Sequence, residues 1–249
     1  MKKLLFALTL TGLLPLTSKA QYWTSGGELI FSWANYQDST QKLNGPPRFT
    51  LFLNLNYKYN IDFGQHFGMA FGFGIRNMGF ITTNEVYAVP GTGDIPIKYD
   101  KIKRRSYNLG VPVMFKIGNV KKDRFLAIGG EYEWLFHYKE KRFISGQKTK
   151  RKAFNSNETN RFLPSVFVAY QMNDFGMIKV QYYLNDFLNK NFVDQLGNKP
   201  YANTSSQIMM ISWMGNMRAN KLKSKIKNQT KEDEYSAFNH VLKNVRVSY

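Results

Sequence analysis

Residues 48–60 read Arg-Phe-Thr-Leu-Phe-Leu-Asn-Leu-Asn-Tyr-Lys-Tyr-Asn, with a hydrophobic side chain at nearly every second position. One face of an extended chain would carry Phe49, Leu51, Leu53, Leu55, Tyr57 and Tyr59. The other would carry Arg48, Thr50, Asn54, Asn56, Lys58 and Asn60, with Phe52 as the apolar exception. A period of two is typical of a β-strand with one apolar face. The run is about as long as the ~9–11 tilted residues of a transmembrane strand, so it predicts a strand of a membrane barrel.

Seven other segments repeat this alternation. They are residues 27–36, 66–80, 106–118, 124–138, 161–172, 176–187 and 206–217. An even number of strands is the rule for bacterial single-chain barrels, and the pattern of long and short connections fits one. The long connections are 37–47, 81–105, 139–160 and 188–205. The sequence therefore predicts an all-β, eight-stranded antiparallel up-and-down transmembrane barrel, with long external loops and periplasmic termini.

The alternative is a soluble barrel that holds its apolar face inward. An eight-stranded lumen is only just wide enough for side chains. Large residues such as Phe67, Phe71 and Phe73 gather on one face, while the other is rich in Gly, Ala, Asn and charge. Because the large side chains would overfill the lumen, we expect the face that carries them to contact lipid. The mean hydropathy of −0.41 does not oppose this, since alternating faces cancel in such an average.

The chain divides into three predicted parts. Residues 1–20 have a basic start, a short apolar run and a small-x-small end, typical of a secretory signal peptide cleaved after Ala20. Residues 21–217 form the predicted outer-membrane barrel, and residues 218–249 a basic periplasmic tail. The sequence has no cysteine, so neither acylation as a lipoprotein nor disulfides are expected.

The formal net charge of +18 suggests anionic partners. Export argues against nucleic acid, so outer-membrane lipid and lipopolysaccharide are the expected partners. The pattern predicts no catalytic residue set, no cofactor and no metal site.

Seven charged residues are expected to point into the lumen, where a buried charge must be paired or neutralised. They are Glu28, Lys58, Arg76, Lys116, Glu131, Glu133 and Lys179. We expect a closed ion-pair network that plugs a narrow barrel. A small ion-conducting pore is the alternative.

The predicted external loops are strongly basic. Their candidate anion-binding residues are Lys101, Lys103, Arg104, Arg105, Lys148, Lys150, Arg151 and Lys152. Such clusters could bind the phosphates of lipopolysaccharide or an acidic partner. A merely hydrated, charged rim explains them equally well.

His137 raises an enzymatic alternative. By strict alternation it shares a face with Glu131 and Glu133. A base oriented by a carboxylate would suit a hydrolase acting on outer-membrane lipid. No serine is placed by the sequence to complete such a site, so a non-enzymatic protein is the preferred hypothesis.

The tail contains a predicted helix. Thr230 followed by Asp233 resembles a capping-box start. Phe238, Val241, Leu242 and Val245 then recur at helical spacing and form one apolar face that could dock a partner protein. A terminal strand ending at Tyr249 is the alternative, but it would make nine strands.

Residues 107–116 read Tyr-Asn-Leu-Gly-Val-Pro-Val-Met-Phe-Lys, which resembles the Tyr-Leu-x-x-Pro-x-x-x-Lys signature of the PorT-like family of outer-membrane β-barrels. The resemblance implies a small barrel without catalytic residues and a role in an envelope or type IX-like protein-secretion assembly. Within the signature, Pro112 lacks a ladder donor and should lie at a bulge or beside a disrupted pair. Lys116 should point inward and need a carboxylate partner.

Overall fold

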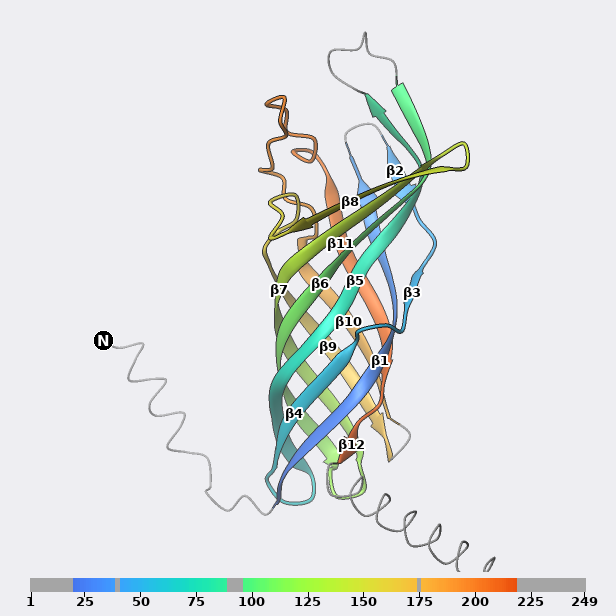
Figure 1. The fold of residues 1–249 in the computed structure, drawn as a ribbon. Helices are drawn as coiled ribbons and strands as arrows, with labels where there is room; N and C mark the ends of the chain where they lie inside the picture. Colours follow the sequence, from blue (N-terminus) through green and yellow to red (C-terminus); the bar gives the residue numbers. More distant parts are fainter. Residues whose placement is uncertain (1–19, 39–40, 89–95, 174–175, 219–249) are drawn as a thin grey trace, which may run out of the picture.

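The computed structural model describes residues 20–38, 41–88, 96–173 and 176–218, and its named elements are all β-strands (Figure 1). They are β1 (Ala20–Gln37), β2 (Lys42–Asn44), β3 (Arg48–Thr50), β4 (Leu55–Asp62), β5 (Phe67–Ala88), β6 (Pro96–Asn119), β7 (Arg124–Ile144), β8 (Gln147–Phe154), β9 (Phe162–Met172), β10 (Met177–Asp186), β11 (Ser205–Met214) and β12 (Met217–Arg218). No helix in these ranges is long and apolar enough to span a membrane.

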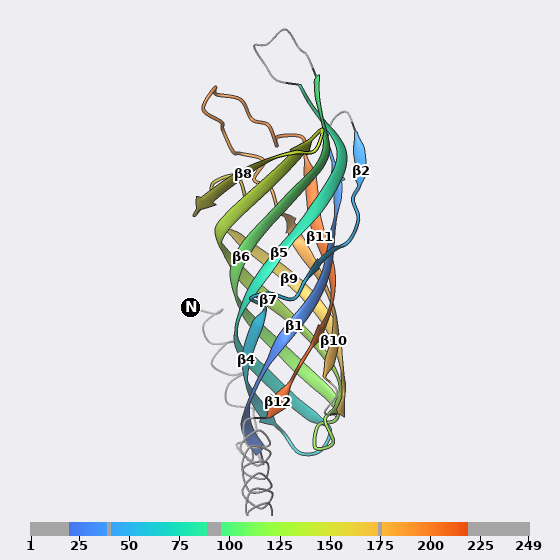
Figure 2. The same cartoon turned by 45° about the vertical axis from the view of Figure 1, so that its right-hand side comes forward.

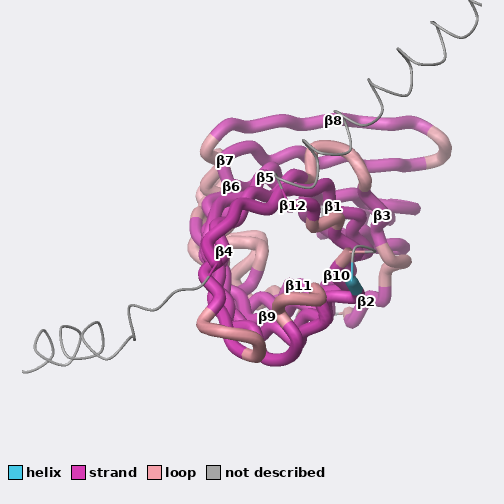
Figure 3. Tube along the Cα trace, turned by 90° about the horizontal axis from the view of Figure 1, so that it is seen from below, coloured by secondary structure: helices cyan, strands magenta, loops and turns pink. Residues whose placement is uncertain are grey.

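Eight strands form a closed antiparallel ring. The order is β1, β4, β5, β6, β7, β9, β10 and β11, and β11 pairs back onto β1, with Phe31 opposite Ile211. The view along the barrel shows this ring directly (Figure 3). Each wall strand pairs with the next wall strand along the chain, because short turns favour antiparallel neighbours. The predicted all-β, eight-stranded antiparallel architecture is confirmed.

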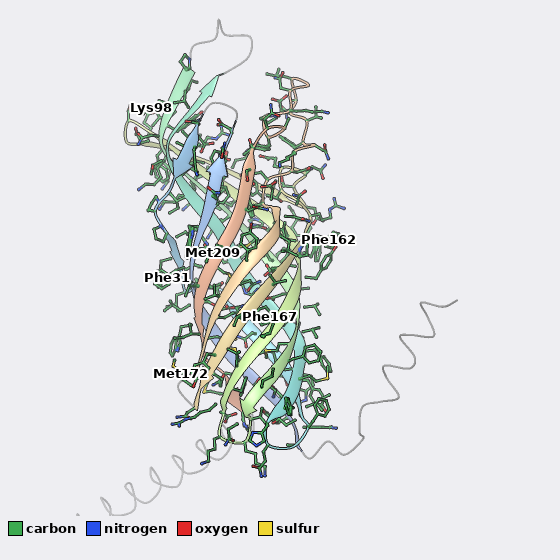
Figure 4. The ribbon with its side chains drawn as sticks, turned by 180° about the vertical axis from the view of Figure 1, so that it is seen from behind. Phe31, Lys98, Phe162, Phe167, Met172 and Met209 are labelled. Atoms are coloured by element: carbon green, nitrogen blue, oxygen red, sulfur yellow. The ribbon has the colours of Figure 1, made fainter. Side chains whose placement is uncertain are left out.

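The wall separates an apolar outside from a filled lumen. On β6, for example, Leu109, Val111, Val113, Phe115 and Ile117 are exposed, whereas their neighbours Asn108, Met114 and Lys116 are buried. The labelled Phe31 and Phe162 lie at the outer edges of the wall in Figure 4, and both are exposed. The large face therefore points outward, as the alternation predicts.

The lumen is not lined by small and polar residues alone. An upper cluster of buried side chains includes Phe80, Tyr138, Tyr183 and Phe187, and a lower one includes Phe125, Phe167, Met177 and Met214. Tyr138 belongs to this inward set and is 1% exposed. Apolar layers thus fill the lumen above and below its charged residues.

The stretch 48–60 is not one continuous strand, which corrects the first prediction. β3 ends at Thr50, β4 begins at Leu55, and Leu53 has a left-handed φ of 58°. The Asn54 side chain donates to the Thr50 carbonyl at 3.2 Å and accepts from the Asn77 amide at 2.8 Å. A short polar side chain that binds nearby backbone competes with strand pairing, so an alternation broken only at Phe52 did not secure a continuous strand.

Three wall strands extend beyond the ring at the upper end, where long loops were expected. β5, β6 and β7 continue past the predicted strand ends into 81–105 and 139–160, and β8 adds a further strand on β7 (Figure 2). The ladder includes the pairs Lys103↔Lys141 and Lys141↔Lys150. The basic residues assigned to loops therefore belong largely to a projecting sheet.

Both expectations for the signature strand are confirmed. The β5–β6 ladder is interrupted between Val113 and Gly110, which is where Pro112 lies. Lys116 points inward and its Nζ lies 2.5 Å from Asp62 Oδ1.

Two predicted segments lie outside the described residues. The signal peptide falls there except for Ala20, where β1 begins, and so does the predicted docking helix of the tail. The described part of the chain ends at Arg218 of β12, whose Nη2 donates to the Val120 carbonyl at 3.0 Å and to Asp123 at 2.5 Å. This residue fastens the chain to the β6–β7 turn at the lower end.

Candidate functional site

Arg76 of β5 is the centre of a charged layer halfway along the lumen. Its Nε lies 2.9 Å from Glu28 Oε2, and its Nη1 lies 2.8 Å from Glu131 Oε2 and 2.6 Å from Glu133 Oε1. All four side chains are at most 4% exposed. Because β1, β5 and β7 each point these residues inward, the ring brings three carboxylates to one guanidinium.

Lys179 of β10 is the second cation of the layer. Its Nζ lies 3.0 Å from Glu28 Oε1 and 3.9 Å from Glu131 Oε2. Neutral donors complete the layer, as buried charges require. They are Ser212 to Glu28 at 2.5 Å, Asn108 to Glu133 at 2.8 Å and Tyr183 to Glu133 at 2.6 Å. The sequence prediction missed these donors, although their inward parity was a usable signal.

Two of the predicted luminal lysines lie outside this layer. Lys58 is buried with its Nζ 3.0 Å from Met214 Sδ, and no carboxylate in the described part of the chain lies within 4.0 Å of it. Lys116 forms a separate pair with Asp62 near the lower end, where its Nζ also lies 5.3 Å from the Tyr22 ring centroid. The predicted network is thus divided between two levels.

The space beside Lys58 is small. A cavity of about 20 Å³ is lined there by Asn56, Arg76, Glu131, Lys179 and apolar neighbours. That volume suits a single water molecule. The Asn56 Oδ1 and Glu131 Oε1 atoms have no hydrogen-bond partner among the described residues, so a water there would have polar groups to bind.

Arg104 belongs to a second buried cluster at the upper end and is not available as a surface anion ligand. Its two Nη atoms bind the Glu85 carboxylate at 2.7 and 2.8 Å, and its Nε lies 3.4 Å from Glu140 Oε2. Arg104 is 0% exposed. Burial would raise the pKa of Glu85, but the charge and hydrogen bonds of Arg104 outweigh it and lower the pKa to about 2.

Arg151 of β8 shares the face of Arg104 and is also paired. Its Nη2 contacts Glu158 and lies 3.5 Å from Glu140 Oε1. Of the eight predicted anion-binding residues, these two arginines are therefore held by carboxylates. The other six, on β6 and β8, lie on the opposite face of the projecting sheet.

His137 does not share a face with Glu131 and Glu133, which corrects that prediction. On β7, Tyr107 pairs with His137 but Asn108 pairs with Leu135, so Phe136 is an inserted bulge residue. One extra residue turns the following side chains to the other face. His137 lies beside Tyr107, with ring centroids 5.6 Å apart, and its Nδ1 has no hydrogen-bond partner. No carboxylate orients it as a base.

The residues that the structure describes contain no group of three His, Cys, Asp or Glu side chains that could hold a metal. What they define is a narrow, closed β-barrel with a charged, plugged lumen.

No protein-family profile and no curated protein matches this chain. Its similarities to crystal structures have low scores. The attachment invasion locus protein Ail of Yersinia pestis, solved with the heparin analogue sucrose octasulfate, is 14% identical with a TM-score of 0.34, covering 79% of this chain and 99% of that one. Neisserial surface protein A is 10% identical with a TM-score of 0.32, covering 78% and 96%.

The toluene transporter TbuX of Ralstonia pickettii is 9% identical with a TM-score of 0.19, covering 78% of this chain and 89% of that one. Similarities at these scores assign neither a family nor a function to this chain. The fold assignment rests on the chain's own closed strand pairing.

Proposed function

We propose that this protein is a non-enzymatic integral outer-membrane β-barrel with a sealed lumen, which serves as a structural or accessory subunit of an envelope assembly. The observation that carries the proposal is the closed ring with large apolar side chains on its outside. On every wall strand, exposed large apolar residues face outward. A soluble barrel would bury this surface, whereas lipid tails would cover it.

Aromatic residues border the apolar belt at its upper edge. Tyr132 stacks on Phe162 with ring centroids 5.5 Å apart, and Trp134 packs on Phe136 at 5.7 Å. Aromatic girdles of this kind mark the level of the lipid–water interface. Their position supports a membrane in which β5, β6 and β7 project beyond the bilayer at the end opposite Ala20 and Arg218.

The sealed lumen predicts that the purified full chain in a planar bilayer gives no stable single-channel steps. Layers of packed aromatic and charged side chains leave no continuous water path along the barrel axis. A Phe167→Gly, Tyr183→Gly variant, which removes one buried ring from each apolar layer, should produce measurable steps and serves as the positive control. Stable steps from the unaltered protein would contradict the proposal and favour a small pore.

The accessory-subunit role is supported by the resemblance of residues 107–116 to the PorT-like signature and by the predicted apolar face of the tail. We expect gently solubilised native outer membranes to hold this protein in a complex well above the chain's own 28.9 kDa. Serine at Phe238, Val241, Leu242 and Val245 should release it, while serine at Asn239, His240, Lys243 and Asn244 should not. Blue-native electrophoresis with identification of the bound proteins measures both. A lone species in unaltered membranes would refute the subunit role.

A further inference from the structure

The projecting sheet carries an array of cations in register on its outward face. Three rows cross β6, β7 and β8, and residues directly opposite one another share a face. The rows are Arg105, Lys139 and Lys152; Lys103, Lys141 and Lys150; and Lys101, Phe143 and Lys148. Neighbours are separated by ~5 Å between strands and ~7 Å along a strand. Eight cations and one phenylalanine therefore form this cationic grid.

The grid has no internal neutralisation. None of its eight cations has a carboxylate within 4.0 Å among residues 20–38, 41–88, 96–173 and 176–218. The adjoining positions on β5 are Gly79, Ile81 and Thr83, which carry no charge. Like charges directly opposite one another destabilise a sheet, so folding does not account for this arrangement. The lowered pKa of Lys141, through desolvation and the charges of Arg105 and Lys148, reflects the same crowding.

The grid lies on the same outward stripe as the apolar belt. Along β6, alternate residues run from Ile117 to Leu109 through the belt, then to Tyr107, and then to Arg105, Lys103 and Lys101. The Arg105 guanidinium lies 5.3 Å from the Tyr107 ring centroid, and its Nε is buried without a hydrogen-bond partner in the part of the chain that the structure describes. Cations placed directly above an aromatic girdle lie at the depth of lipid headgroups.

We propose that the cationic grid binds the phosphates of a lipid headgroup in the outer leaflet, and that its occupant is a phosphorylated glycolipid of the lipopolysaccharide type. A planar array presents several cations to one multiply phosphorylated headgroup, and the belt beneath it receives the acyl chains. The opposite face of the sheet is unsuited to this role, because Arg104 and Arg151 are held there by Glu85, Glu140 and Glu158. The proposal rests on the membrane placement proposed above.

The test measures binding of the full chain, folded in zwitterionic detergent, to a fluorescent phosphorylated lipopolysaccharide anchor and to its dephosphorylated form. The Lys103→Gln, Lys141→Gln, Lys150→Gln variant removes the middle row. Each basic residue near an anionic lipid surface strengthens binding about fivefold, so loss of three of them should lower the affinity about a hundredfold. A Lys121→Gln, Lys122→Gln, Lys199→Gln variant has the same charge change away from the grid and should bind as the unaltered protein does.

The outcomes are separable. Equal affinity for the two lipids would overturn the proposal, and so would full affinity in the middle-row variant. Binding of soluble inorganic polyphosphate without binding of the lipid would show that the grid recognises free phosphate, which would refute a lipid headgroup as its ligand. Thermal unfolding of the middle-row variant checks its fold, and it should be at least as stable as the unaltered protein because repulsion is removed. Heat-modifiable mobility after reconstitution into zwitterionic vesicles tests the barrel itself, independently of phosphate.

Discussion

Replacement of Arg76 by methionine is expected to lower the free energy of unfolding of the barrel by about 3–5 kcal/mol, the cost of removing one partner from a buried ion pair. Glu131 and Glu133 would lose contacts of 2.8 and 2.6 Å to the guanidinium and would be left with Lys179 as the nearest cation of the layer. Methionine fills similar space, so the effect should come from unpaired charge and not from a void. Urea unfolding in lipid vesicles, followed by tryptophan fluorescence, measures it.

Two further variants identify the cause. Combining Arg76→Met with Glu133→Gln should recover part of the loss, because one uncompensated carboxylate is removed. Lys98→Met changes the same charge at an exposed position and should leave stability within about 0.5 kcal/mol of the unaltered value. If Arg76→Met alone also stayed within that range, the lumen would have to be hydrated well enough to screen three carboxylates, and it would not be sealed.

Acidification is expected to weaken the projecting sheet through Glu85. Its pKa lies at about 2, below its ordinary value of 4.5, because Arg104 outweighs the effect of burial. A carboxyl with a lowered folded-state pKa contributes stability above its unfolded-state pKa and loses it as pH falls. The Glu85–Arg104 pair should therefore contribute fully above about pH 4.5 and lose about 3 kcal/mol by about pH 2.

The comparison with Glu85→Gln isolates this contribution, since all other carboxylates are common to both proteins. The variant should be less stable than the unaltered protein at pH 7. Between pH 5 and pH 2, its loss of stability should be about 3 kcal/mol smaller than that of the unaltered protein. Glu140 also has a lowered pKa, from Arg104 and Arg142 acting against burial, whereas burial raises the pKa of Glu158. These two shifts act in opposite directions and are common to both proteins. Parallel pH profiles would show that the Glu85–Arg104 pair is not the acid-sensitive element.

The strand pattern was accessible from the sequence because the lipid-facing and luminal sides of a strand differ so strongly. The same period placed five charged residues in the lumen: Glu28, Arg76, Glu131, Glu133 and Lys179. Because the ring is closed, these residues pair mainly with one another. Their common level depends on strand stagger, which alternation does not encode. For that reason Lys58 and Lys116 could not be separated from the layer in advance.

Local irregularities account for the errors. The bulge at Phe136 is silent in the sequence because Leu135 and Phe136 are both apolar, so alternation fails there without any change in composition. At residues 51–54 the alternation has a single exception, Phe52, and backbone binding by Asn54 interrupts the strand there. The sequence does contain an alternation that indicates the extension of β6, because Ile102 and Arg104 alternate with Lys101, Lys103 and Arg105. The high density of basic residues made this segment look like a charged loop. Reading 98–105 as a strand would have separated Arg104 from the grid.

The pairing of β1 with β11 also constrains the order of folding. Glu28 meets Met214 across the closing seam, so the contact joins residues near the two ends of the barrel sequence. Such a long-range contact forms late, because a large loop must be ordered before it is gained. Until β11 arrives, β1 and the growing wall each present an unpaired edge, which would be costly in the proposed membrane. Delivery of residues 205–214 is therefore the step that removes both open edges and completes the wall.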